Sequence, residues 1–473
     1  MVEVAKYTLV LIAIINAAIV VVPYLMGRAE LMSIRNFFLL GFTIYQVTSG
    51  VICLHNPANF ASEIALSQPA DTSLKFVIWV IVFEAVFLAA YRWGIGAKRL
   101  ARWTPIIQGE AREPILWLFA FTLLGAAALL RLSVFIPYVS ILTSHIGTSV
   151  AAVAAGLGAW IWVRRPLNPA AAAFMFLVLF LAIAIGITGV FGRRPIVAIA
   201  ACIGWGTYYS RWRNLHPATV LARAAIFGII PVVLVAKYTT VRGNFYQSSE
   251  GPFSRMMQIA EADTMTGLVD LVSGQECAAW SMYLMQMYPE YHEYRHMHAI
   301  KYYFQFSVPR AIWPDKPHAL AEIAWVDADI PGMPDGFTIG PGIIGHAASE
   351  GGFYALLIYA TALGLFVRYF DSVLARAPMQ PFVALPIGAS MGNLLGIPRG
   401  ETPNFAYEFT VGVLGSLVIL IIVARLLKAM GFITNSDFNQ PGLEGDTHHA
   451  DGSTDGLYDP NYTASYGSDP ESN

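Results

Sequence analysis

The chain has 473 residues, of which 56% are hydrophobic and only 13% are charged, and its formal net charge is −2. Soluble globular proteins carry about 25% charged residues, so this composition excludes an ordinary soluble protein. A lipid bilayer is therefore the expected surrounding for most of the chain.

Apolar runs long enough to cross about 30 Å of hydrocarbon as helices recur along the chain. They predict about eleven transmembrane helices, near residues 7–26, 36–54, 75–91, 115–132, 141–163, 169–190, 195–210, 218–236, 351–370, 381–397 and 404–424. The first run lacks a basic leader and is followed directly by others, so we expect a retained helix and not a cleaved signal. The predicted fold class is an all-α polytopic integral membrane protein.

Basic residues near helix ends mark the cytoplasmic side of a membrane protein. Five of them lie between the third and fourth runs: Arg92, Lys98, Arg99, Arg102 and Arg112. If that loop is cytoplasmic, the other basic loops, near residues 164–165, 211–213, 368–376 and 425–428, are cytoplasmic as well. The same topology places the polar segment 237–350 on the opposite side.

Four regions follow from this pattern. Residues 1–236 should form helices 1–8, residues 237–350 an extracytoplasmic loop that contains helices, and residues 351–430 helices 9–11. Residues 431–473 are expected to be a disordered cytoplasmic tail, because they are acidic and poor in apolar residues. From Asp437 on, the tail carries eight acidic residues and no Lys or Arg, so the net charge without it is +6. The three cysteines, Cys53, Cys202 and Cys277, predict no disulfide framework.

A stiff cationic loop is predicted at Val308–Pro317, where Val-Pro-Arg is followed by Trp-Pro and Lys-Pro. Each proline fixes its own φ and pushes the preceding residue toward extended geometry. Arg310 and Lys316 should therefore be presented from a rigid backbone, with Trp313 between them. Such a loop suits an anionic or sugar-bearing ligand.

Further cations are predicted on the same side, and they border glycine: Arg193 and Arg194 after Gly192, Arg242 before Gly243, and Arg399 before Gly400. Glycine lets a backbone approach a ligand closely, and guanidinium groups bind phosphate oxygens in bidentate fashion. A diphosphate is the natural counterpart, and in a membrane it belongs to a polyprenyl carrier of glycan. Alternatively, any one of these arginines could simply anchor a helix end at lipid phosphates.

The segment from 190 to 425 resembles the Wzy-type O-antigen and oligosaccharide repeat unit polymerases. The resemblance is carried by the block Val308–Pro317, the glycine-rich turn from Gly340 to Gly345 leading into Gly351 and Gly352, and the pairs Gly192-Arg193 and Arg399-Gly400. It implies a bacterial inner-membrane enzyme, active at its periplasmic face, that polymerises polyprenyl-diphosphate-linked oligosaccharide repeat units into a surface polysaccharide. Polyprenyl diphosphate would be released, and no nucleotide sugar, cofactor, metal or nucleic acid is expected. A flippase and a chain-length regulator would be partners of such an enzyme, besides its lipid-linked substrate and membrane lipids.

The resemblance also suggests roles for single residues. Diphosphate would be bound by Arg193, Arg194, Arg242, Arg310, Lys316 and Arg399, and Trp313 would contact the glycan. The acceptor hydroxyl needs a base, for which histidine and carboxylates are suited. His346 stands where the family pattern has glutamate and is the first candidate; Glu350, four residues on and on the same helical face, would orient it. Glu401 is the second candidate, and the alternative is that His346 only caps or hydrogen-bonds a loop.

Two competing motifs lie in the polar segment. His292-Glu293-Tyr294-Arg295-His296 matches the His-Glu-x-x-His pattern of zinc peptidases, which requires both histidines on one helical face, and Glu322 would be a third ligand. Asp327-Ala328-Asp329 has the form of the Asp-x-Asp metal or phosphate site of glycosyltransferases, although solvated loop acids are the alternative.

Other functions stay open beside polymerisation. An O-antigen ligase would use similar outward arginines and a histidine, and a lipid or glycan transporter is an alternative of another class. A carboxylate at bilayer depth, such as Glu84, usually faces a cavity or a partner. Glu84 stands nearly alone, however, and we expect it to be neutral or paired with an arginine such as Arg131 or Arg223.

Overall fold

The computed structural model describes residues 1–55, 69–107, 110–136, 139–187, 194–247, 252–272, 276–327, 340–434 and 438–439. These segments are helical apart from turns and one antiparallel pairing of two-residue strands, β1 (Glu110–Ala111) with β2 (Phe438–Asn439). The predicted all-α fold class is therefore confirmed. The acidic tail beyond residue 439, and the prediction that it is disordered, lie outside the described residues.

Nine helical segments in the described residues are long and apolar enough to cross a membrane. They are α1 (Val2–Leu25), the segment Ile34–His55, α4 (Pro69–Trp93), α6 (Glu113–Leu132), α7 (Ser140–Arg164), α8 (Pro169–Ile187), α10 (Pro217–Gln247), α17 (Gly352–Ala375) and α20 (Thr402–Ala429). Ile34–His55 consists of α2 (Ile34–Phe42), a π-helical stretch (Thr43–Thr48) and α3 (Ser49–His55).

The other two predicted spans are helical but shorter. α9 (Arg194–Ser210) has 17 residues, and the apolar segment Pro381–Gly396 is divided into α18 (Pro381–Ala389) and α19 (Met391–Gly396). A multi-pass membrane architecture is thus supported, whereas the count of eleven spans is not confirmed. The remaining helices are α5 (Ile95–Ala101), α11 (Pro252–Glu261), α12 (Thr264–Val272), α13 (Cys277–Met287), α14 (His298–Gln305), α15 (Leu320–Asp327) and α16 (Gly342–Glu350), with 3₁₀ turns at Ser133–Phe135 and Trp212–Asn214.

α7 is the central helix of the bundle. The most apolar window of α7 is 78% buried, against 6% for α10 at the periphery. Small residues make this possible, because they let neighbouring helices approach closely. A Cβ on Gly156 would lie only 2.6 Å from the sulfur of Cys202 in α9 and 2.8 Å from Leu385 in α18. At Gly156, side chains of α9 and α18 therefore pack directly against the backbone of α7.

Polar contacts join the loops that the sequence predicts to be on one side. Arg376 donates hydrogen bonds to the carbonyl oxygens of Ala101 and Thr104, both at 2.7 Å. Arg165 pairs with Glu113 at 3.1 Å, and β1 pairs with β2. We call this end of the bundle the basic-loop end, and the opposite end the insert end.

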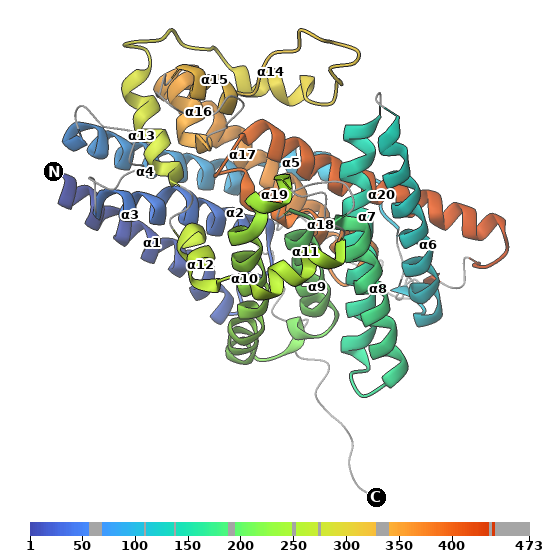
Figure 1. Ribbon diagram of the computed structural model, residues 1–473. Coiled ribbons are helices and arrows are strands. Elements are labelled where there is room, and N and C mark those ends of the chain that lie inside the picture. The colour runs from blue at the N-terminus through green and yellow to red at the C-terminus, as the bar shows by residue number, and fades with distance from the viewer. Residues whose placement is uncertain are drawn as a thin grey trace, which may run out of the picture.

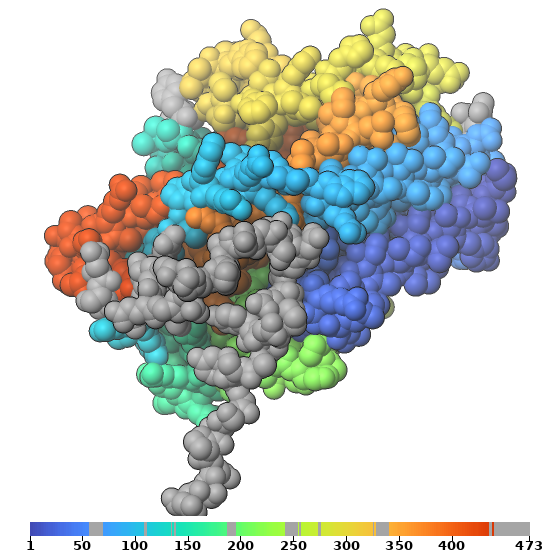
Figure 2. Space-filling model, turned by 180° about the vertical axis from the view of Figure 1, so that it is seen from behind, coloured from blue at the N-terminus to red at the C-terminus, as the bar shows by residue number. Residues whose placement is uncertain are grey.

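The segment predicted as one extracytoplasmic loop has three parts. Its first residues, from Lys237, continue α10 as far as Gln247. α11 and α12 pack back along α10, where Lys237 Nζ donates to the carbonyl oxygen of Ala260 at 2.6 Å. α14, α15 and α16 lie together over the insert end (Figure 1), and a view from behind shows the same layer, yellow to orange, covering that end (Figure 2). The first residues of the predicted extracytoplasmic segment therefore belong to α10, and α16 ends at its last residue, Glu350. The bounds 237–350 stay a prediction.

Gly364 should be essential for the close packing of α17 on α4. A Cβ there would lie 2.6 Å from the carbonyl oxygen of Phe87 and 2.8 Å from the Cβ of Ala90. Overpacking of this kind costs about 1–3 kcal/mol, so Gly364→Val should lower the melting temperature of the purified protein in detergent. Gly125→Val is the matched control, because a Cβ on Gly125 in α6 meets nothing within 4 Å. Equal melting of both variants would contradict the close α4–α17 packing.

Candidate functional site

The loop Val308–Pro317 connects α14 to α15 at the insert end and is held by its own hydrogen bonds. Arg310 Nη1 donates to the carbonyl oxygens of Lys316 at 2.9 Å and Pro314 at 3.3 Å. Arg310 is exposed and forms no ion pair with a carboxylate among the described residues. Trp313 is 36% exposed beside it. The loop therefore presents one cation and one aromatic ring outward.

Lys316 does not have the ligand-facing position that the sequence suggested. It is only 5% exposed, and its ammonium donates to the carbonyl oxygens of Phe306 at 2.9 Å and Val308 at 3.2 Å. It also lies 5.4 Å from the ring centroid of Tyr302. Burial, with a smaller effect of the Arg310 cation, lowers the pKa of Lys316. The side chain holds the base of the loop, because a buried ammonium needs such partners.

His346, Glu350 and Glu401 come together in one buried network. His346 Nδ1 lies 2.8 Å from Glu350 Oε1, and His346 Nε2 lies 3.8 Å from Glu401 Oε2. Neither His346 nor Glu350 has any exposed surface, and Glu401 is 7% exposed. The predicted pairing of His346 with Glu350, one turn apart, is confirmed. The proximity of Glu401 links α16 to the start of α20.

Each carboxylate also binds the first turn of a helix that borders the cationic loop. Glu350 Oε2 accepts a hydrogen bond from the backbone N–H of Ala299 at 2.7 Å, at the start of α14. Glu401 accepts from the N–H groups of Leu320 at 3.2 Å and Ala321 at 2.8 Å, at the start of α15. The first N–H groups of a helix lack partners within the helix and favour negative charge. The network thus ties α14, the helix before the loop, and α15, the helix after it, to α16 and to the start of α20.

Both ring nitrogens of His346 are used inside this network. Its Nδ1 is engaged by Glu350, and its Nε2 faces Glu401 and lies 3.3 Å from the backbone N–H of Thr402. Neither ring nitrogen is open to an acceptor hydroxyl, so the expectation that His346 acts as the base is not met by this geometry. Burial alone lowers the pKa of His346, but the carboxylates of Glu401 and Glu350 outweigh burial and raise it. Burial raises the pKa of Glu401, and His346 only partly offsets that effect.

Arg399 is, after Arg310, the other predicted diphosphate-binding cation whose described side chain is not fully buried. Its guanidinium is half-buried, lies 6.0 Å from the ring centroid of Tyr45 and forms no ion pair among the described residues. The preceding Pro398 is held by the buried Gln46, whose Nε2 donates to its carbonyl oxygen at 2.7 Å. Gln46 also explains the glycine-rich turn, because Gly342 has φ +61° and a Cβ there would lie 2.0 Å from Gln46 Nε2.

The remaining predicted arginines lie outside what the structure describes. Arg193 is not among the described residues, and for Arg194 and Arg242 only the helical backbone is described. Their assignment to diphosphate binding stays a prediction.

The competing motifs take other forms. His292 to His296 is not helical, and His296 has a positive φ of 29°, so the two histidines do not share a helical face. Glu322 pairs with His318 at 2.6 Å. Asp327 is not a solvated acid, because it pairs with Arg295 at 2.6 Å; Asp329 lies outside the described residues.

Glu84 contacts an amide and not the expected arginines. Asn16 Nδ2 lies 3.4 Å from Glu84 Oε2. Arg131 instead donates to Ser144 at 2.7 Å and to the carbonyl oxygen of Gly186 at 3.0 Å. The suggested pairing of Glu84 with Arg131 is therefore wrong.

Sequence reasoning missed one acid–base pair at the insert end. His145 Nε2 in α7 lies 3.8 Å from Glu408 Oε1 in α20, and the two side chains are 21% and 3% exposed. The ring of His145 lies 6.4 Å from that of Phe306, just before the cationic loop. Glu408 follows Glu401, the N-cap of α20, by seven residues, which is about two helical turns. Two acids seven residues apart at the start of an apolar run were the sequence feature that could have indicated this pair.

In comparisons with protein-family models, curated proteins and solved structures, no match to this chain was found. The resemblance to Wzy-type polymerases therefore remains a hypothesis, and the function has to be inferred from the residues at the insert end.

The His346 network should make stability depend on pH. Because the pKa of His346 is raised in the folded protein, its stabilisation is complete below about pH 6.5, the ordinary histidine value, and is lost as the pH rises through the raised pKa. The raised pKa of Glu401 acts in the same direction, since folding disfavours its ionised form. The wild-type melting temperature should therefore fall between pH 6 and 9, and less so in His346→Gln. His55→Gln, at an exposed position, is the control, and parallel curves for wild type and His346→Gln would disprove this coupling.

Proposed function

We propose that the protein polymerises polyprenyl-diphosphate-linked oligosaccharide repeat units at the insert end of its membrane bundle. The observation that carries this proposal is the buried network of His346, Glu350 and Glu401. It holds two arginine-bearing segments, the loop of Arg310 and the turn of Arg399, at one end of a bundle of membrane-spanning length. Two fixed cations at the end of a membrane domain suit a lipid that carries a diphosphate.

The proposed reaction transfers a glycan between two lipid carriers. The acceptor hydroxyl attacks the anomeric carbon of the donor glycan, a new C–O bond forms, and the bond to the donor diphosphate breaks. The polyprenyl diphosphate leaves with the bonding electron pair, and the guanidinium groups of Arg399 and Arg310 stabilise its negative charge. The donor bond supplies the driving force, so no nucleotide sugar is consumed.

The proton of the acceptor hydroxyl requires a base that substrate can reach. Both nitrogens of His346 are engaged inside the protein, whereas the ring of His145 is partly exposed beside Glu408. We assign the base to His145, with Glu408 stabilising the imidazolium that forms. His346 then acts only through the positions of Arg310 and Arg399.

An O-antigen ligase would use the same chemistry with a different acceptor. Deletion of the gene separates the two functions, because loss of a polymerase leaves single repeats on lipid, whereas loss of a ligase leaves an undecorated lipid A core. A zinc peptidase is disfavoured by the non-helical course of residues 292–296.

Polymerisation should be observable with purified components. The protein, mixed with polyprenyl diphosphate oligosaccharide and no nucleotide sugar, should give a ladder of products on a gel. Arg399→Ala should slow the ladder by about 10²–10³-fold, the loss typical for one group that stabilises transition-state charge. Arg102→Ala, an exposed arginine at the basic-loop end, is the control. No ladder from wild type, with substrate that another polymerase elongates, would refute the function.

Substitutions of His145 and His346 should have different effects on stability and on polymerisation. His145→Gln should melt like wild type but polymerise about 10²–10⁴-fold more slowly, which is the usual contribution of a general base. His346→Gln should lower the melting temperature, because it removes the imidazole that both buried carboxylates face. Wild-type rates from His145→Gln would remove it from the mechanism.

A further inference from the structure

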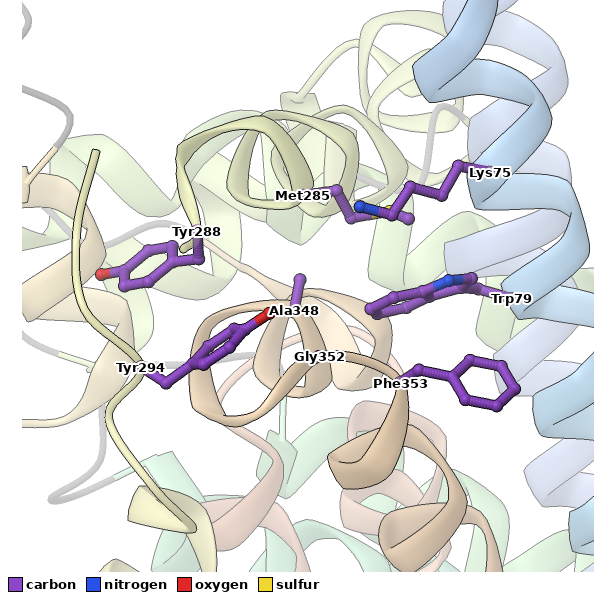
Figure 3. A pocket seen from close by; sticks show the side chains of 8 residues that line it. All are labelled: Lys75, Trp79, Met285, Tyr288, Tyr294, Ala348, Gly352 and Phe353. Atoms are coloured by element: carbon purple, nitrogen blue, oxygen red, sulfur yellow. The ribbon is translucent and has the colours of Figure 1, made fainter. Parts of the chain in front are cut away.

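A second feature of the insert end is a pocket of about 250 Å³ between α4, α13 and the junction of α16 with α17. It is lined by Lys75, Trp79, Met285, Tyr288, Tyr294, Ala348, Gly352 and Phe353 (Figure 3). Pockets for drug-sized ligands measure roughly 300–1,000 Å³, so this one suits a single small headgroup. None of these residues belongs to the site of Arg399 and Arg310.

The pocket combines one cation with several aromatic rings. Lys75 is exposed, forms no ion pair among the described residues, and its ammonium lies 5.5 Å from the ring centroid of Trp79. Figure 3 shows that this ammonium reaches across the pocket toward Met285. An unpaired ammonium favours an anion, and the faces of aromatic rings favour the C–H surfaces of a sugar.

Small residues keep the pocket open beneath the rings. Ala348 and Gly352 are four residues apart and lie where α16 gives way to α17. Gly352 has φ +64°, and a Cβ on it would lie 2.8 Å from the hydroxyl oxygen of Tyr294. Figure 3 shows this hydroxyl pointing toward Ala348. It has no hydrogen-bond partner among the described residues and can therefore bind a polar ligand group.

The pocket lies near the starts of two candidate membrane spans. Its exposed residues, Lys75 and the 43%-exposed Phe353, lie near the starts of the candidate spans α4 and α17. Deeper along the same helices, Ile78, Ile81 and Ile358 are each 44–48% exposed. Apolar side chains exposed on spanning helices face lipid. A ligand with a lipid tail could thus place its headgroup in the pocket while its tail stays in the bilayer.

We propose that this pocket binds the headgroup of a membrane lipid that carries a sugar on a phosphate or diphosphate. Lys75 binds the phosphate, Trp79 and Phe353 contact the sugar ring, and the hydroxyl of Tyr294 binds a sugar hydroxyl. That this lipid is the acceptor of glycan transfer rests on the proposed function; the binding itself does not.

Binding is tested with three probes and the full-length protein in detergent. Farnesyl-diphosphate-linked N-acetylglucosamine carries the lipid tail, the diphosphate and the sugar. Inorganic diphosphate carries only the anion, and phosphatidylglycerol is a phosphate-bearing lipid without a sugar. The first should bind at least tenfold more tightly than the other two. Lys75→Gln and Ala348→Leu, which fills the pocket, should each weaken its binding at least tenfold, whereas Lys301→Gln, at an exposed lysine of α14, should not. Because Lys75 is exposed, Lys75→Gln tests the site even if Ala348→Leu does not fold.

Equal binding of inorganic diphosphate or phosphatidylglycerol, or unchanged affinity in Lys75→Gln, would overturn the pocket proposal. The product ladder separates this result from failure of the proposed function. Lys75-dependent binding without any ladder supports the pocket and refutes polymerisation. A ladder that Lys75→Gln forms at the wild-type rate, with unchanged affinity for the probe, supports polymerisation and refutes the pocket.

Discussion

The insert end of the molecule depends on one buried interaction, the contact of His346 with the carboxylates of Glu350 and Glu401. Ionisable groups without access to water are stable only when their charges and hydrogen bonds are satisfied. Here each carboxylate meets the imidazole on one side and the first N–H groups of a helix on the other. The contacts that satisfy the carboxylates are therefore the same contacts that hold α14 and α15 in place. Removal of one partner from such a network costs about 3–5 kcal/mol, so the network stabilises the placement of α14 and α15 on either side of the loop of Arg310.

The network works only because α16 is short and completely enclosed. All nine of its residues are buried, and glycines with positive φ stand at its first residue and at the first residue of α17, which follows it. Gly342 has φ +61° and leaves room for Gln46, and Gly352 has φ +64° and leaves room for Tyr294. One end consequently sets the position of Pro398 and Arg399 through Gln46, and the other forms the floor of the Lys75 pocket. A single buried helix thus connects the turn of Arg399 with the Lys75 pocket.

The sequence predicted the helical membrane fold because apolar runs of spanning length leave few other structures. It also predicted the His346–Glu350 pair, since four residues make one helical turn. Contacts between residues far apart in the chain could not be predicted from the sequence. The residues adjacent to Arg310 and Lys316 do not indicate that the guanidinium is exposed and the ammonium buried. That difference arises from the rings of Tyr302 and Phe306, which enclose Lys316 only after α14 has packed. The same holds for Glu401 with α15 and for His145 with Glu408, each of which joins helices far apart in the chain.

If Arg399 binds the donor diphosphate and the Lys75 pocket binds the acceptor, α13 determines the distance between the two sites. Gly340 lies between Arg399 and Cys277, since a Cβ on it would lie 3.0 Å from the carbonyl oxygen of Arg399 and 3.4 Å from the sulfur of Cys277. Cys277 begins α13, and Met285, eight residues later, lines the pocket. At 1.5 Å per residue the two positions are about 12 Å apart along the helix. Two lipid diphosphates bound at one point would repel each other, whereas this spacing keeps their charges apart. The sugar residues of the glycan would then span the distance between the two diphosphates. Under the proposed function, α13 and the buried α16 would therefore keep the two lipid-linked glycans apart during the transfer.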